Sequence, residues 1–133
     1  MSIESSVDII TEWDIVAARQ LGRNEAKEVG FGTVDQARIT TAISELARNI
    51  YLYAGKGKII IERVTDGAMK GLIIIAADQG PGIPDLRKVM EDGYTTSGGL
   101  GAGMPGVKRL MDEFKVDTEV NVGTTITATK WLR

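Results

Sequence analysis

The chain has 133 residues, a length that suits one compact domain, expected over residues 1–133, with a single hydrophobic core. It contains no cysteine and no histidine, which excludes disulfides, zinc–thiolate sites, cysteine nucleophiles, serine–histidine triads and phosphohistidine. The net charge of −2 gives no overall attraction to nucleic acid or to anionic lipid.

The first half of the chain alternates between strand-like and helix-like patterns. Residues 3–9 alternate apolar and polar side chains, which predicts a short strand. Apolar residues at helical spacing predict a helix over 14–29, and the glycines of 30–32 stop it. A second helix is expected over 33–53, with Gln36 three residues after its first residue as a capping-box partner.

The second half of the chain contains the most apolar segment, Leu-Ile-Ile-Ile-Ala-Ala at 72–77. This run predicts a strand that is buried on both faces or central in a sheet. The other expected elements are a strand at 59–64, a turn at 66–67, a helix at 106–114, and a closing hairpin of strands at 115–119 and 124–131. Because helices and strands mix without strict alternation, we expect a two-layer α/β sandwich with a mixed, mostly antiparallel sheet and helices on one face.

Two polar residues lie within the second helix. Glu45 and Asn49 are four residues apart, so both side chains project from one helix face, at the edge of the apolar stripe that includes Leu46 and Ile50. Taken alone, this pair is typical of an ordinary helix surface.

Two further clusters follow the apolar strand. Asp78-Gln-Gly-Pro-Gly places a carboxylate at the end of a buried strand, where it needs a partner, although Asp, Gly and Pro are also common turn residues. Residues 97–104 are rich in glycine and precede a helix, so their backbone N–H groups suit an anion, although a mobile loop has the same composition. The spacing of glycines over 101–106 also fits a dinucleotide fingerprint, but no strand is predicted directly before it.

Together these clusters resemble the GHKL (Bergerat-fold) ATPase family, which includes gyrase, Hsp90, histidine kinases and MutL. Glu45 with Asn49 is similar to the family's N box, and the segment 78–82 is similar to its first glycine box. The segment 99–103 is similar to the second glycine box, and Gly123-Thr124 is similar to a late Gly-Thr element. Within the family, the segments 11–24, 37–57 and 99–114 look like those of small bacterial kinases that control sigma factors.

The resemblance implies an ATP site with Mg²⁺. Asn49 would bind the metal ion, Asp78 the adenine amino group with Thr124 beside it, and Glu45 would act as the general base or orient the acceptor hydroxyl. The resemblance also implies that two groups of glycines approach the nucleotide. Gly80 and Gly82 would lie near the base. Gly99, Gly101 and Gly103 would lie near the phosphates, within a lid of about 93–105.

The positive group near the transferring phosphate is not evident from the resemblance. Anti-sigma relatives carry an arginine in the lid, whereas this chain reads Gly101-Ala102-Gly103 there. Arg48, Lys108 and Arg109 are the candidates within the chain.

By resemblance, the activity is that of a serine/threonine protein kinase. The implied partners are STAS-domain antagonist and stressosome scaffold proteins, and a PP2C-type phosphatase that the kinase activates once released, with no nucleic acid and no membrane. Two alternatives stay open: a kinase that binds a sigma factor directly, and a non-catalytic module that docks when it holds nucleotide.

Residues of the first helix carry a repeated positive charge. Arg19, Arg23 and Lys27 recur every four residues, which is typical of a solvated face but also suits docking of an acidic partner. Residues 1–10 lack the basic and apolar segments of a signal peptide, and no apolar run approaches the roughly 20 residues of a membrane span. We therefore expect the protein in the cytoplasm.

Overall fold

The fold is described from a computed structural model, in which residues 3–84, 90 and 103–133 are placed well enough to describe. The elements follow one another in this order: β1 (Ile3–Ile9), α1 (Glu12–Val29), α2 (Thr33–Asn49), the π-helical turn η1 (Ile50–Ala54), β2 (Gly57–Asp66), β3 (Met69–Asp78), α4 (Gly103–Leu110), β4 (Glu113–Glu119) and β5 (Gly123–Trp131). Among the described residues, no helix is both long and apolar enough to cross a membrane.

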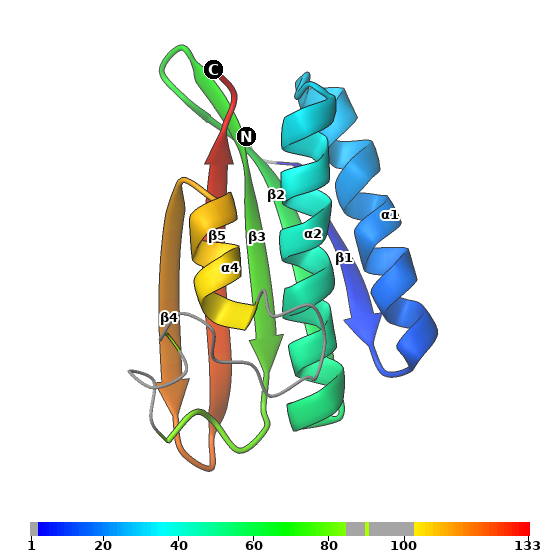
Figure 1. The fold of residues 1–133 in the computed structure, drawn as a ribbon, viewed down its shortest axis with the longest axis vertical. Helices are drawn as coiled ribbons and strands as arrows, with labels where there is room; N and C mark the ends of the chain where they lie inside the picture. Colours follow the sequence, from blue (N-terminus) through cyan, green and yellow to red (C-terminus); the bar gives the residue numbers. More distant parts are fainter. Residues whose placement is uncertain (1–2, 85–89, 91–102) are drawn as a thin grey trace.

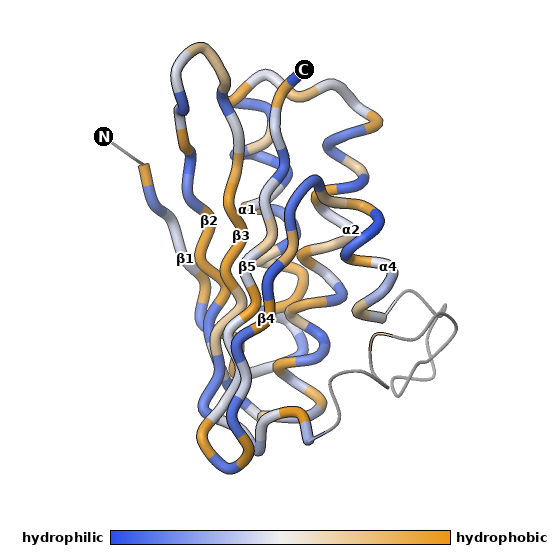
Figure 2. The backbone as a smooth tube through the Cα atoms, turned by 90° about the vertical axis from the view of Figure 1, so that its left-hand side faces the viewer, coloured by the Kyte–Doolittle hydropathy of each residue, from blue (hydrophilic) through white to orange (hydrophobic). Residues whose placement is uncertain are grey.

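The five strands form one sheet in the order β1-β2-β3-β5-β4. All four ladders between them are antiparallel, and β2–β3 and β4–β5 are hairpins. The helices α1, α2 and α4 cover one face of this sheet, as Figure 1 shows, and Figure 2 shows the two layers edge-on. The expected two-layer α/β sandwich with helices on one face is confirmed, but the described sheet is wholly antiparallel and not mixed.

The core lies between the sheet and the helices. Alternate residues of β2 and β3, such as Ile59, Ile61, Leu72 and Ile74, are completely buried against this layer. Burial of each such side chain contributes about 1.5–3 kcal/mol relative to exposure. The prediction that 72–77 is a central strand is confirmed, because β3 is the middle strand of five.

A glycine brings the two long helices close together. A Cβ atom added at Gly22 of α1 would lie 2.1 Å from Cδ1 of Ile43 in α2. Ile43 is completely buried, so a larger residue at position 22 would require the Ile43 side chain or the helix to shift. The end of α1 is as expected, with Gly30 in a left-handed conformation at φ +111°.

Two details of the predicted helices are wrong. The residue before α2 that caps it is Gly32, and the Gln36 side chain donates to the carbonyl oxygen of Phe31 at 2.7 Å, so Thr33 and Gln36 form no capping box. The helix expected over 106–114 runs from Gly103 to Leu110. It stops there because the N–H of Asp112 donates to the Thr129 carbonyl at 2.8 Å, so pairing with β5 begins at once.

Candidate functional site

The predicted site residues lie on elements that meet at one end of the molecule. The C-terminal ends of α2 and β3 point to this end, and α4 begins on the same side (Figure 1). α2 packs against α4, and η1 packs against both β2 and β3. The chain segments that carry Asn49, Asp78 and Gly103 are therefore neighbours in space, although they are far apart in the sequence.

Asp78 is the last residue of β3 and is half-buried. Its Oδ1 atom accepts a hydrogen bond from the Gly80 N–H at 2.9 Å. Within the described part of the chain, its second oxygen, Oδ2, accepts no hydrogen bond. The turn after β3 is thus fixed by one carboxylate oxygen, which leaves the other as an acceptor for a ligand.

The neighbours of Asp78 in the sheet are Gly57 in β2 and Thr124 in β5. Thr124 is only 8% exposed, and its hydroxyl lies 2.9 Å from the Thr118 hydroxyl of β4. The structure therefore places Thr124 directly beside Asp78, as the sequence analysis expects. A Cβ atom at Gly57 would lie 2.7 Å from Ile50, so this position also requires glycine.

Gly80 and Gly82 are required by the packing of the protein itself. A Cβ atom at Gly80 would lie 2.6 Å from the Ala54 Cβ of η1 and 2.8 Å from its Cα. Gly82 has φ +76°, and a Cβ atom there would lie 2.5 Å from the Glu119 carbonyl oxygen. The close approach of these glycines to a nucleotide base stays a prediction.

The segment after β3 is tied to the β4–β5 hairpin. The N–H of Ile83 donates to the Thr118 hydroxyl at 2.9 Å, and the Asn121 N–H donates to the Pro81 carbonyl at 2.8 Å. Thr118 is not among the residues predicted from the sequence, because it looks like any strand threonine until the hairpin register places it opposite Thr124. Through it, one hydroxyl links the loop, β4 and β5.

Glu45 and Asn49 lie on the last turns of α2. The Glu45 side chain is 11% exposed, and its Oε1 accepts a hydrogen bond from Arg48 Nη1 at 2.9 Å. Asn49 is the last α-helical residue and is half-buried. The expected position of this polar pair at the edge of the buried face is confirmed.

The helix continues past Asn49 as a single π turn, Ile50–Ala54, which the sequence does not signal. The turn closes with a hydrogen bond from the Gly55 N–H to the Ile50 carbonyl at 3.0 Å, and Gly55 adopts φ +82°. Single π turns occur often at functional sites because they displace the residues around them. Here the π turn brings Ala54 against Gly80.

The predicted phosphate loop is described only in part. Gly99 and Gly101 lie outside the described residues, as does most of the expected lid of 93–105. Gly103 is the first residue of α4 and has φ +53°. Its position at a helix N-terminus suits an anion, because the first N–H groups of a helix have no partner within it.

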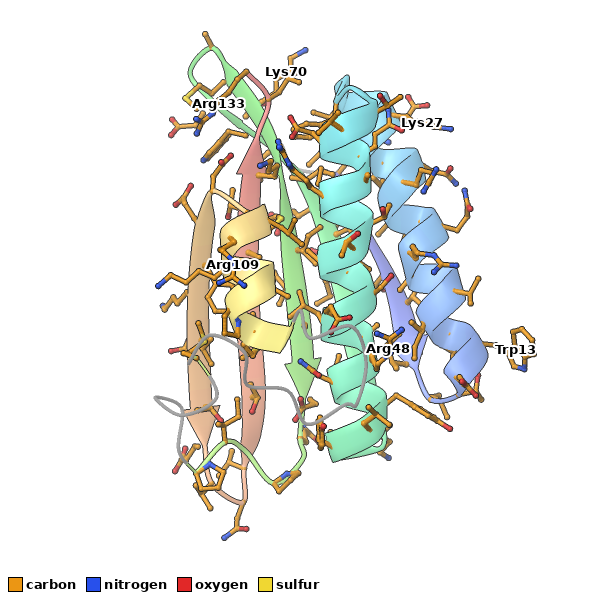
Figure 3. The ribbon with its side chains drawn as sticks, viewed as in Figure 1. Trp13, Lys27, Arg48, Lys70, Arg109 and Arg133 are labelled. Carbon is orange, nitrogen blue, oxygen red and sulfur yellow. The ribbon has the colours of Figure 1, made fainter. Side chains whose placement is uncertain are left out.

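The three candidate cations differ in position. Arg48 is bound to Glu45, on the side of α2 that faces α1 (Figure 3). Lys108 and Arg109 are in the last turn of α4, at the opposite end of that helix from Gly103. Figure 3 shows Arg109 directed away from α2. Of the three, only Arg48 contacts a predicted site residue in the described structure.

The basic residues of α1 are all on the surface. Arg19, Arg23 and Lys27 are exposed, and none of them forms an ion pair within residues 3–84, 90 and 103–133. Trp13 on the same helix is 81% exposed and extends outward from the first turn (Figure 3). Whether this face binds a partner stays a prediction.

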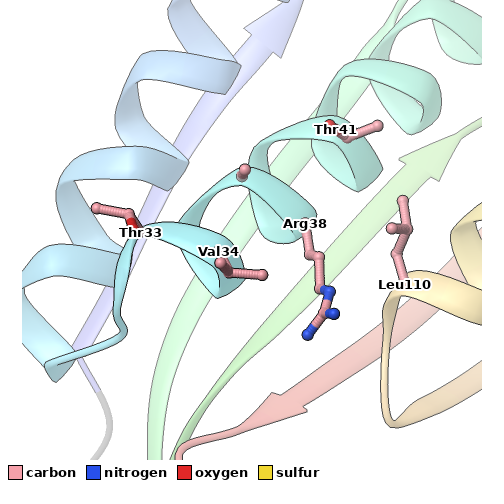
Figure 4. A pocket seen from close by; sticks show the side chains of 6 residues that line it. Thr33, Val34, Arg38, Thr41 and Leu110 are labelled. Atoms are coloured by element: carbon pink, nitrogen blue, oxygen red, sulfur yellow. The ribbon is translucent and has the colours of Figure 1, made fainter.

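A groove of about 420 Å³ lies between α2 and α4, away from these residues. It is lined by Leu110 and by the N-terminal half of α2 (Figure 4), namely by Thr33, Val34, Ala37, Arg38 and Thr41. Of the predicted nucleotide-binding residues that the structure describes, none lines this groove.

Comparison with known proteins shows the family to which the chain belongs. Residues 34–133 match the family model of the histidine kinase-, DNA gyrase B-, and HSP90-like ATPases. The chain is 76% identical to the serine/threonine-protein kinase RsbT of Bacillus subtilis (strain 168) over the full length of both chains. It is 32% identical to an anti-sigma F factor of Bacillus licheniformis over 75% of this chain and 73% of that protein.

Solved structures show the same fold at low identity. All of this chain aligns with 33% of the crystal structure of the RsbU and RsbW domains of a Mycobacterium tuberculosis protein, with a TM-score of 0.65 and 20% identity. The mycobacterial sensor histidine kinase MprB aligns over 97% of both chains, with a TM-score of 0.54 and 18% identity. Together, the matched family model, the full-length similarity to RsbT and the shared fold show that this chain belongs to the histidine kinase-, DNA gyrase B- and HSP90-like ATPase family.

Proposed function

We propose that the chain is an ATP-dependent serine/threonine protein kinase that acts in a bacterial partner-switching system. The observation that carries the proposal is the meeting of two segments at one end of the fold: Asp78, whose Oδ2 atom accepts no hydrogen bond from the described residues, and the Glu45–Asn49 turn of α2. The 76% identity to RsbT, which extends over every part of the chain, supports the same activity.

Asp78 is the residue that would recognise adenine. Its Oδ1 atom is held by the Gly80 N–H, so Oδ2 is oriented and available to accept a hydrogen bond from the adenine amino group. A charge-assisted hydrogen bond of this kind contributes about 1.5–3 kcal/mol. The Thr124 hydroxyl lies beside it, held by Thr118, and would complete the recognition of the base edge.

The described residues suit a magnesium ion that takes most of its ligands from the nucleotide and few from the protein. No cluster of three or more acidic side chains that could form a metal site by itself occurs among the described residues. Mg²⁺ in nucleotide sites uses few protein oxygens and several from phosphate and water. The half-buried amide of Asn49 supplies one such oxygen, and the bound ion would neutralise phosphate charge.

Glu45 is the residue that would accept the proton during transfer. The serine or threonine hydroxyl of the partner attacks the γ-phosphorus of ATP, the bond to the β–γ bridging oxygen breaks, and ADP leaves. The hydroxyl proton passes to the Glu45 carboxylate, which lies one helical turn before Asn49 on the same face of α2. The remaining work of the site is positioning and charge neutralisation.

The partners we propose are STAS-domain antagonist and stressosome scaffold proteins as phosphate acceptors, and a PP2C-type phosphatase regulatory domain that binds the released kinase. The exposed residues Arg19, Arg23 and Lys27 on α1 offer a basic face for an acidic partner. We place this exchange in the cytoplasm. Charge reversal at Arg23 should weaken capture of the partner and spare ATP binding.

The test is phosphate transfer from labelled ATP to a purified STAS-domain protein in the presence of Mg²⁺, followed by mapping of the phosphorylated residue. The chain should transfer label to a serine or threonine, and Glu45→Gln should bind ATP with unchanged affinity while transfer falls by about 10²-fold or more. Glu28→Gln, on the exposed side of α1, serves as the charge-matched control. Transfer by Glu45→Gln at the wild-type rate would remove the proposed role of Glu45.

A second candidate function is that of a kinase that binds a sigma factor directly. The 32% identity to an anti-sigma F factor over three quarters of the chain favours it. Capture experiments with a sigma factor, a STAS-domain protein and a phosphatase regulatory domain separate the two functions. ATP binding without transfer to any of the three would instead support a nucleotide-dependent docking module.

A further inference from the structure

An arginine donates a hydrogen bond to one oxygen of the proposed catalytic carboxylate. Arg48 Nη1 lies 2.9 Å from Glu45 Oε1, one helical turn further along α2. The Glu45 side chain is 11% exposed and the Arg48 side chain is 39% exposed, so the cation reaches a largely buried acid from the surface. A carboxylate at this depth needs a partner, and Arg48 is its ion-pair partner within the described part of the chain.

A second arginine–carboxylate pair on α2 has the same spacing in the sequence and serves as a comparison. Asp35 and Arg38 have the same spacing and nearly the same separation, 3.0 Å, but their side chains are 31% and 50% exposed. Spacing of three residues is therefore enough to form such a pair anywhere on α2. What distinguishes the Glu45 pair is its burial and its place, one turn before Asn49.

The contact restricts the geometry of the carboxylate. Glutamate has three rotatable bonds, and an unbound carboxylate samples several rotamers. Binding of Oε1 to Arg48 selects one orientation and leaves Oε2 as the atom that can accept a proton. General-base catalysis depends on this orientation, because the base must lie within hydrogen-bond distance of the proton that it removes.

We propose that Arg48 is a positioning residue, which acts through Glu45 by holding its carboxylate in the orientation that accepts the substrate proton. This inference rests on the proposed role of Glu45. It assigns Arg48 a function distinct from charge neutralisation at the γ-phosphate. The cation for that step must then come from elsewhere in the chain or from a partner.

The test is a double-mutant cycle on the transfer reaction, with Glu45→Gln, Arg48→Ala and the double variant. Arg48→Ala should lower kcat by about tenfold and leave the affinity for ATP unchanged, because a displaced base slows only the chemical step. The double variant should be no slower than Glu45→Gln, since Arg48 has nothing left to position. Arg48→Lys should recover most of the lost rate, because a single N–O contact needs only one donor.

The matched control is Arg38→Ala, which removes an arginine from an equivalent pair on the same helix and should leave kcat unchanged. Arg48→Ala with the wild-type kcat would overturn the inference, as would an effect that multiplies with that of Glu45→Gln or a parallel loss of ATP affinity. If Glu45→Gln itself transfers phosphate normally, the proposed base fails, and the inference falls with it for that separate reason.

Discussion

Asp78 at the end of β3 lies directly opposite Thr124 at the start of β5, as paired residues of the antiparallel ladder. The loop that follows Asp78 is held by Thr118 of β4, whose hydroxyl also contacts that of Thr124. One threonine hydroxyl thus ties the loop after β3 to the β4–β5 hairpin. This relationship fixes the predicted adenine-binding carboxylate on the rigid end of a central strand.

Replacement of Asp78 by alanine should abolish the recognition of adenine without unfolding the protein. Loss of a charge-assisted hydrogen bond of about 1.5–3 kcal/mol corresponds to an affinity for ATP lower by about 10- to 100-fold. The measurement is the dissociation constant for ATP by isothermal titration calorimetry. A Tm close to that of the wild type would show that the fold is intact.

The control for this variant is Asp66→Ala, at the exposed far end of the same β2–β3 hairpin. It removes the same charge and should bind ATP as the wild type does. Equal affinity of both variants would contradict the role of Asp78 in binding the base.

Gly80→Ala tests whether the loop glycine is required by the protein or by the ligand. The added Cβ would lie 2.6 Å from the Ala54 Cβ, and an overpacked contact of this kind costs about 1–3 kcal/mol. We expect a lower free energy of unfolding, measured by urea denaturation in the absence of nucleotide.

The second variant in this test is Gly80→Ala combined with Ala54→Gly. Removal of the Ala54 methyl group relieves the closest contact, so the double variant should recover part of the loss beyond the cost of Ala54→Gly alone. Stability of Gly80→Ala equal to that of the wild type would mean that the loop moves freely away from η1.

Much of the fold follows from the sequence pattern because its signals are local. β1 and the end of α1 at Gly30 appear where alternation and glycine predict them. The polar clusters at Glu45–Asn49 and at Asp78 also stand out, because charged or amide side chains interrupt apolar runs. Their convergence at one end of the molecule is not visible in any single segment, and only their order along the chain indicates it.

The features that escaped prediction depend on contacts between distant segments. α4 ends at Leu110 because Asp112 pairs with Thr129, and Thr118 acquires a partner only through the register of β4 and β5. The capping box expected at Thr33 and Gln36 is absent because α2 is capped by Gly32, one residue earlier, and the Gln36 side-chain amide donates to the Phe31 carbonyl. At Asp112 and Thr118 local propensity competes with tertiary contacts, and the tertiary contacts prevail.

The buried ion pair between α1 and β2 should stabilise the fold more than the exposed pair between β1 and β2. Glu25 is 5% exposed and accepts hydrogen bonds from Ser5 Oγ at 3.1 Å and from Arg63 Nε at 2.9 Å. Glu25→Ala leaves Arg63, whose side chain is 31% exposed, without this partner, and the loss costs about 1–3 kcal/mol. The free energy of unfolding from urea denaturation is the measurement.

Asp8→Ala removes the exposed pair with Lys58, in which the charged atoms lie 3.8 Å apart. We expect a cost of less than about 1 kcal/mol, because water and salt screen such pairs. Similar losses for Glu25→Ala and Asp8→Ala would show that burial does not decide the strength of these pairs.

The start of α1 should make stability depend on pH in a definite direction. The Asp14 carboxylate accepts hydrogen bonds from the backbone N–H groups of Thr11 at 2.8 Å and Ile10 at 2.9 Å, and these bonds lower the pKa of Asp14 below its usual value. Because the folded-state pKa is depressed, the charged form favours folding above the unfolded pKa of about 3.9, and this contribution is lost as pH falls through the folded pKa.

The measurement is the Tm of the wild type, Asp14→Asn and Asp14→Ala between pH 7 and pH 2. The wild type should melt above Asp14→Asn at neutral pH, and this difference should shrink below about pH 4, since the asparagine cannot titrate. The difference in Tm between Asp14→Asn and Asp14→Ala measures what an uncharged amide oxygen contributes as a hydrogen-bond acceptor. This difference should stay constant with pH. A wild-type advantage that persists unchanged to pH 2 would mean that the carboxylate charge does not stabilise the start of this helix.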